Sequence, residues 1–137
     1  MSGKPLLLDT GGWLRALAGH EPYAREVRAA LPAIVPGLVL AEVDWHLRRR
    51  RADMQRVLRE LREGAYAYEA PTLEDLHRAA EIDRKFGDIE IGLVDASIAA
   101  LAERTQVRRV LTIDKDFTVI RVGPRWRTTL ELAVPLP

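Results

Sequence analysis

Apolar and polar residues along this chain form two alternating kinds of segment. Pro5–Leu8 is a continuous apolar run closed by Asp9-Thr10-Gly11-Gly12, a pattern typical of a short strand that is buried on both faces and ends in a tight turn. Val110–Ile113 resembles it and is closed by Asp114-Lys115-Asp116-Phe117. Two further segments are strand candidates. Ala65–Ala70 alternates weakly between apolar and polar residues, and Thr129–Val134 would be the last strand of the chain.

Helical spacing of apolar residues occupies most of the chain between these runs. Thr72, three residues before Asp75, has the pattern of a helix N-cap. The predicted helices are Gly12–Ala18, Pro22–Leu31, Leu38–Arg51, Ala52–Gly64, Leu73–Phe86 and Leu93–Thr105, the last being the most apolar. Because helices separate the strands, we expect an α/β sandwich with a mainly parallel central sheet flanked by helices.

Composition narrows the classes of protein that this chain can belong to. Its 137 residues predict a single domain, and 47% apolar with 30% charged residues excludes a disordered chain. No apolar run approaches the roughly 18 residues of a membrane span, and Met1–Thr10 lacks the features of a signal peptide. With no cysteine, thiolate metal sites and thiol nucleophiles are excluded; we expect a cytoplasmic protein with no membrane partner.

Charge is balanced, with 21 basic and 20 acidic residues, so net charge predicts no nucleic-acid partner. The run Arg48–Arg51 could follow an RNA backbone, or it could complement the dipole at the end of a helix. Trp13, Trp45 and Trp126 could stack on bases, or they could be core or interface residues. For the arginine run and for the tryptophans alike, the sequence leaves both alternatives open.

Acidic residues recur where solubility does not require them. Asp9 and Asp114 each follow a predicted buried strand, with Asp116 two residues further on, and neighbouring parallel strands would bring them to one edge of the sheet. Glu42 flanks an apolar helix stripe, and Asp95 begins the apolar helix. Taken singly, these could be turn acids, a helix N-terminal anion or partners of arginines.

Carboxylates that converge in one place would repel one another and require a cation. The three histidines, His20, His46 and His77, are scattered, although His46 lies one helical turn after Glu42 and could join the ligands. An all-oxygen ligand set favours Mg²⁺, with Mn²⁺ as a substitute, over zinc. Such ions activate water and stabilise the leaving oxygen of a phosphodiester, so the pattern indicates nucleic-acid hydrolysis.

Four ordered motifs make the chain similar to the PIN-domain nucleases, and especially to the VapC toxins of toxin–antitoxin pairs. They are Leu6-Leu7-Leu8-Asp9-Thr10, Pro36 with Glu42 six residues later, Leu93–Ala100, and Leu111–Phe117. The resemblance covers nearly the whole chain, so residues 1–137 are expected to be a single PIN-like domain with an α/β/α fold.

The resemblance also implies a Mg²⁺-dependent endoribonuclease, a homodimer, and silencing by a VapB-type antitoxin. Carried over by position, the metal-binding catalytic acids are Asp9, Glu42, Asp95 and Asp114, with Asp116 a possible fifth, and Thr10 and Thr112 support the site. One departure is Gly12-Trp13, where smaller or aliphatic residues are commoner, and it leaves the shape of the substrate pocket open.

Three other functions are alternatives to hydrolysis of RNA. Asp9-Thr10-Gly11 also occurs in dimeric aspartic proteases, but those proteins are almost all β and this chain carries several amphipathic helices. An aspartyl phosphatase would need an aspartate at position 11, which is Gly11 here. A non-catalytic PIN-like module that binds RNA or protein is the remaining alternative, and loss of one or more acids would favour it.

Overall fold

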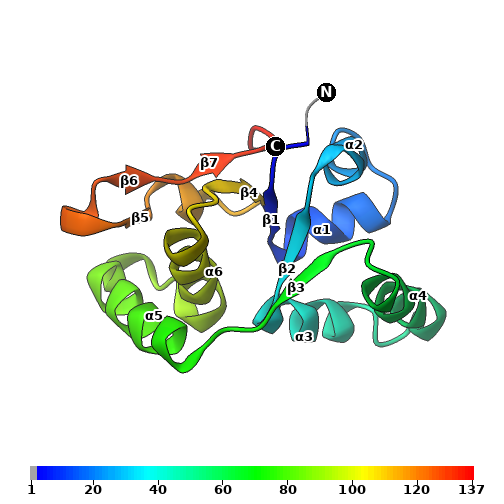
Figure 1. Ribbon diagram of the computed structural model, residues 1–137, viewed down its shortest axis with the longest axis horizontal. Coiled ribbons are helices and arrows are strands. Elements are labelled where there is room, and N and C mark those ends of the chain that lie inside the picture. The colour runs from blue at the N-terminus through cyan, green and yellow to red at the C-terminus, as the bar shows by residue number, and fades with distance from the viewer. Residues whose placement is uncertain (1–2) are drawn as a thin grey trace.

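The central element of the fold is a five-stranded parallel sheet (Figure 1). The computed structural model describes residues 3–137, and the first two residues of the chain, the start of the segment considered above as a signal peptide, lie outside it. In spatial order the strands are β3 (Ala67–Glu69), β2 (Ala33–Pro36), β1 (Leu6–Leu8), β4 (Arg109–Leu111) and β7 (Glu131–Leu132). The parallel α/β architecture predicted from the sequence is confirmed.

Helices occupy both sides of this sheet, with α5 and α6 on the left of Figure 1 and α1, α2 and α4 on the right. Their bounds are α1 (Thr10–Leu17), α2 (Tyr23–Ala29), α3 (Gly37–His46), α4 (Arg51–Arg62), α5 (Leu73–Lys85) and α6 (Gly92–Thr105). Three 3₁₀ turns complete the chain: η1 (Gly87–Ile89), η2 (Lys115–Thr118) and η3 (Pro124–Trp126). Among residues 3–137, no helix has the length and apolar character needed to cross a membrane.

The most apolar segments of the sequence form the buried core of the fold. All three residues of β1 have no exposed surface, as expected for a central strand covered on both faces. Helix α6 is buried continuously over Ala96–Ala102, which fits its apolar sequence. Thr72 caps α5 through a reciprocal pair of hydrogen bonds with Asp75, as its spacing predicts.

Two predicted elements are wrong in their extent. Thr129–Val134 is not one strand: β6 (Thr128–Thr129) pairs antiparallel with β5 (Arg121–Val122), and β7 joins the main sheet separately. The segment is divided because its two parts pair with strands of two different sheets, β5 and β4, and the local sequence pattern does not mark this division. The predicted helix Leu38–Arg51 ends at His46, because the chain turns before α4 to pack Met54 and Val57 of α4 into the core.

Helix α1 lies unusually close to the sheet at Gly12. A Cβ atom at this position would be 2.4 Å from the carbonyl oxygen of Leu111 in β4. The neighbouring Trp13 is fully buried and makes an edge-to-face contact with Tyr66. The Gly12-Trp13 departure from the family pattern therefore serves packing of α1 on the sheet, and the indole of Trp13 belongs to the core.

Candidate functional site

Asp9 and Thr112 leave the sheet side by side. Strands β1 and β4 are neighbours, with Leu8 opposite Leu111, and the backbone N–H of Asp9 donates to the carbonyl of Leu111 at 3.0 Å. The residues that follow the two strands therefore start from the same edge of the sheet. This is the place where open parallel sheets bind ligands.

Asp9 is held on both of its carboxylate oxygens. It is the N-cap residue of α1, where Oδ1 accepts from the backbone N–H of Thr10 at 2.8 Å, and Oδ2 accepts from the hydroxyl of Thr112 at 2.6 Å. Only 6% of Asp9 is exposed. Burial raises the pKa of Asp9 to about 6, although these two hydrogen bonds favour the charged form.

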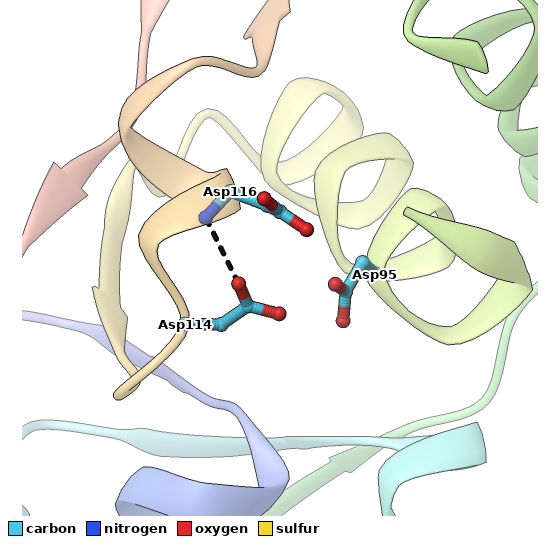
Figure 2. A group of neighbouring side chains, drawn as sticks. All are labelled: Asp95, Asp114 and Asp116. Carbon is cyan, nitrogen blue, oxygen red and sulfur yellow. Dashed lines mark hydrogen bonds between the residues drawn. The ribbon is translucent and has the colours of Figure 1, made fainter. Parts of the chain in front are cut away.

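Three further carboxylates point toward one another in Figure 2. Asp95 comes from the first turn of α6, Asp114 follows β4, and Asp116 lies in η2. One oxygen from each lies within 4.8 Å of the others, the closest set of potential metal ligands in residues 3–137. The loop is shaped by its own hydrogen bonds, because Asp116 N–H donates to Asp114 Oδ1 and Asp114 N–H donates to Thr112 Oγ1, both at 2.9 Å.

Within residues 3–137, no ion pair compensates the charges of this cluster. Burial, the negative charge of Asp9 and the contact with Asp114 raise the pKa of Asp95 to about 8. Burial and Asp114 also raise the pKa of Asp116. Elsewhere acids such as Asp75 are paired with arginines, yet within the described part of the chain no basic side chain forms an ion pair with any of the five candidate acids, Asp9, Glu42, Asp95, Asp114 and Asp116.

This donor set fits a hard divalent cation. It consists of clustered carboxylate oxygens with no sulfur ligand, and a bound cation would offset the burial and the mutual repulsion that together raise the pKa values. The tightest group contains Asp116, which the sequence indicated only as a possible fifth member. Asp9 and Glu42 lie outside that group, although their charges act on Asp95.

Glu42 reaches the site from α3 and is fixed by Thr10. The hydroxyl of Thr10 donates to Glu42 Oε1 at 2.5 Å. The structure thus gives Glu42 a hydroxyl partner instead of the arginine considered from sequence. One turn later, His46 Nδ1 lies 2.9 Å from the backbone carbonyl of Glu42. Because a carbonyl oxygen only accepts hydrogen bonds, Nδ1 is the donor here. The other ring nitrogen, Nε2, takes no part in this hydrogen bond.

The site opens into a cleft of about 490 Å³. Its lining includes Asp9, Thr10, Glu42, His46, Asp95 and Asp114, so four acids from separate parts of the chain share one hollow. Leu93 and Ile113 also line it and are 55% and 36% exposed, which gives the cleft apolar edges. Sequence reasoning did not select these two residues, since a single exposed apolar residue beside a strand or helix end has no distinguishing pattern.

Comparison with known proteins decides the family. Residues 6–122 match the model of the PIN domain. The chain belongs to the PIN domain family. Among curated proteins, this PIN domain is similar to Ribonuclease VapC26 of Mycobacterium tuberculosis, with 31% identity over 125 residues that cover 85% of this chain and 92% of the relative.

Solved structures agree with this PIN domain in fold. VapC20 of Mycobacterium tuberculosis, described as a Sarcin-Ricin loop cleaving toxin, superposes with a TM-score of 0.67 at 24% identity, covering 87% of this chain and 99% of that one. A toxin–antitoxin complex from Klebsiella pneumoniae has a TM-score of 0.69 at 18% identity, covering 95% and 97%. The expected PIN-like α/β/α sandwich is confirmed.

Proposed function

We propose that this PIN domain is a Mg²⁺-dependent endoribonuclease, with Mn²⁺ able to replace Mg²⁺. The observation that carries the proposal is the convergence of Asp95, Asp114 and Asp116 within 4.8 Å, beside a buried Asp9 and without ion-pair partners among residues 3–137. The 31% identical relative is named a ribonuclease, which favours RNA as the substrate. Residues 1–137 would act as one catalytic domain.

The roles of the side chains follow from their positions. Asp9, Glu42, Asp95 and Asp114 would hold the cation directly or through water, and Asp116, which belongs to the tightest oxygen group, would complete the set. Thr112 and the Thr10 backbone keep both oxygens of Asp9 in place, while the Thr10 hydroxyl orients Glu42. When bound, a divalent cation supplies a water of lowered pKa and neutralises charge on the phosphate.

Asp95→Asn tests this function. We expect it to reduce RNA cleavage by at least about a hundredfold, because one charged oxygen ligand becomes an amide beside the reacting phosphate. The metal-free protein should be equally or more stable, since repulsion among the acids falls. The assay is cleavage of structured and unstructured RNAs with Mg²⁺, Mn²⁺ or EDTA.

A suitable control is Asp88→Asn, which alters an exposed acid in η1 outside the cleft. It should cleave like the unmodified chain. Full cleavage by Asp95→Asn with metal present, or undiminished cleavage in EDTA, would refute the metal-dependent mechanism.

We further propose that the chain is the toxin of a VapBC pair, acts in the cytoplasm as a homodimer, and is silenced by a VapB-type antitoxin. The similarity to VapC26 supports this assignment. If it holds, a short reading frame beside the gene should encode a protein whose co-expression relieves growth inhibition by this chain. Growth inhibition that no neighbouring product relieves would argue against the pair.

A further inference from the structure

The three tryptophans have different surroundings, and only one has a largely open surface. Trp13 is fully buried against Tyr66. Trp126 packs edge-to-face with Phe86, and the guanidinium of Arg78 lies 4.4 Å from its ring centroid. Trp45, in contrast, is 60% exposed. Of the two alternatives that the sequence left open, packing therefore holds for Trp13 and Trp126, and only Trp45 is exposed enough to stack on a base.

Trp45 stands beside the acidic cleft. It lies in α3, three residues after Glu42 and directly before His46, and both of these residues line the cleft. Residues three apart on a helix are surface neighbours, so Trp45 lies next to Glu42 on the surface of α3, on the side away from the buried residues Val39 and Val43. A molecule that occupies the cleft and continues along α3 would meet Trp45.

Arg48 holds the indole from one side. Its guanidinium carbon lies 3.8 Å from the ring centroid of Trp45, and its Nη1 donates to the Trp45 backbone carbonyl at 2.9 Å. The stacked arginine covers one face of the ring, and the 60% exposure of Trp45 is consistent with an open second face. An aromatic ring fixed on one side and open on the other is suited to stacking with a planar ligand.

Two arginines of the run have no carboxylate partner among residues 3–137. Arg50 pairs with Asp53 at 2.7 Å and Arg51 pairs with Asp44 at 2.8 Å. Arg48 and Arg49 are exposed, and neither pairs with a carboxylate in the described part of the chain. Positive charge therefore lies at the end of α3, next to a cleft whose own charge would repel a polyanion.

We propose that Trp45, Arg48 and Arg49, here called the α3 shelf, bind a nucleotide of single-stranded RNA that flanks the phosphodiester in the cleft. The indole stacks on the base and the two arginines contact phosphates. Because paired bases in a duplex do not offer a free face, the shelf selects unpaired segments such as loops. The inference rests on the proposed nuclease function, since that function places RNA in the cleft.

The test measures RNA binding separately from cleavage. A short unstructured oligoribonucleotide is titrated in EDTA against the full chain, followed by tryptophan fluorescence and by anisotropy of a labelled RNA. Trp45→Ala should weaken binding about tenfold and abolish the fluorescence change, while Trp45→Phe should recover part of the affinity. Arg48→Ala and Arg49→Ala should weaken binding and flatten its dependence on salt. A fully paired RNA duplex without loops should compete poorly.

Matched controls are Leu73→Ala, an 83% exposed apolar residue of α5, and Arg25→Ala, an exposed arginine of α2. Both should bind RNA as the unmodified chain does. With Mg²⁺, Trp45→Ala should lose cleavage of unstructured RNA mainly through a higher KM.

Three results would overturn the proposed RNA-binding role of the α3 shelf, and a fourth would separate that role from the nuclease function. Unchanged RNA affinity in Trp45→Ala would do so while leaving the nuclease intact. If sedimentation shows that Trp45→Ala loses only self-association, the face is a contact between copies. If it loses only affinity for the antitoxin, the face is a protein-docking surface. Trp45-dependent RNA binding by a chain that cleaves nothing with either metal would refute the nuclease but keep the shelf.

Discussion

Thr112 serves two candidate site residues at once through a single hydroxyl group. It is fully buried, donates to Asp9 Oδ2 at 2.6 Å and accepts from the backbone N–H of Asp114 at 2.9 Å. At the residue scale, this hydroxyl links the end of β1 to the loop after β4. The relative position of the two aspartates therefore depends on one oxygen atom.

Thr112→Val should destabilise the protein by about 1–3 kcal/mol, because it leaves a buried carboxylate oxygen and an N–H without their partner. Loss of the donor should also raise the pKa of Asp9 further, since that hydrogen bond favours the charged form. Urea unfolding measures the first effect, and the pH dependence of metal binding measures the second.

Thr112→Ser should restore most of the lost stability. Thr118→Val removes a hydroxyl that donates to the Lys115 carbonyl on the surface, and it should change stability by less than about 0.5 kcal/mol. Equal destabilisation by the two valine variants would contradict a special role for Thr112.

At the scale of elements, the pairing of β1 with β4 brings Asp9 beside Thr112, and α1 packs closely against β4 at Gly12. Gly12 allows this contact, because its missing Cβ would lie 2.4 Å from the Leu111 carbonyl oxygen. At Gly11, one residue earlier, an added Cβ would meet only side-chain atoms of Ile113, the nearest at 2.6 Å. An added Cβ would therefore meet rigid backbone at Gly12 but a movable side chain at Gly11.

Gly12→Ala should destabilise the protein by about 1–3 kcal/mol, since the helix must move away from the backbone of β4. Gly11→Ala should be close to neutral, because Ile113 can shift and alanine favours the helix by about 1 kcal/mol. Denaturant unfolding of the two variants in parallel provides the measurement. Similar midpoints for both would mean that the contact does not limit the packing of α1.

Periodicity predicted the elements well where a local signal exists. The Thr72 cap marks the start of α5, and the continuous apolar run marks α6. It failed for β5 and for the division of β6 from β7, which are two residues each. Such short strands exist because partners pair with them, so their own residues carry no sufficient pattern.

At the scale of the whole molecule, acids are treated in two ways. Asp75 and Glu103 pair with Arg104 and Arg78, and their pKa values are lowered. The acids of the cleft have no such partners among residues 3–137, and the pKa values of Asp9 and Asp95 rise to about 6 and about 8. Carboxylates without ion-pair partners thus lie together in the cleft, whereas Asp75 and Glu103 outside it are paired with arginines.

The metal-free protein should lose stability as pH rises from about 4 to about 8. A carboxyl with a raised folded-state pKa binds its proton more tightly folded than unfolded, so its favourable contribution is full below its unfolded pKa of 3.8 and disappears through pH 6 for Asp9 and pH 8 for Asp95. Thermal unfolding in EDTA across this range should show a midpoint that falls by several degrees.

Mg²⁺ or Mn²⁺ should raise that midpoint, and more so at pH 8 than at pH 5, because the ion competes with protons for the same oxygens. Asp95→Asn should flatten the decline between pH 6 and pH 8 and weaken the metal effect. A metal-free midpoint independent of pH would contradict uncompensated charge in the cleft.

The sequence by itself determined the α/β class, the helices with strong periodicity, and the acids placed after Leu8 and Leu111, because these depend on local patterns of burial and on the direction of parallel strands. Only the tertiary structure decided which oxygens form the tightest group, that Thr112 and Thr10 hold Asp9 and Glu42, and that Trp45 is exposed while Trp13 is buried. Those outcomes depend on distances between segments remote in sequence, which are set by how helices and strands pack together and not by any one segment.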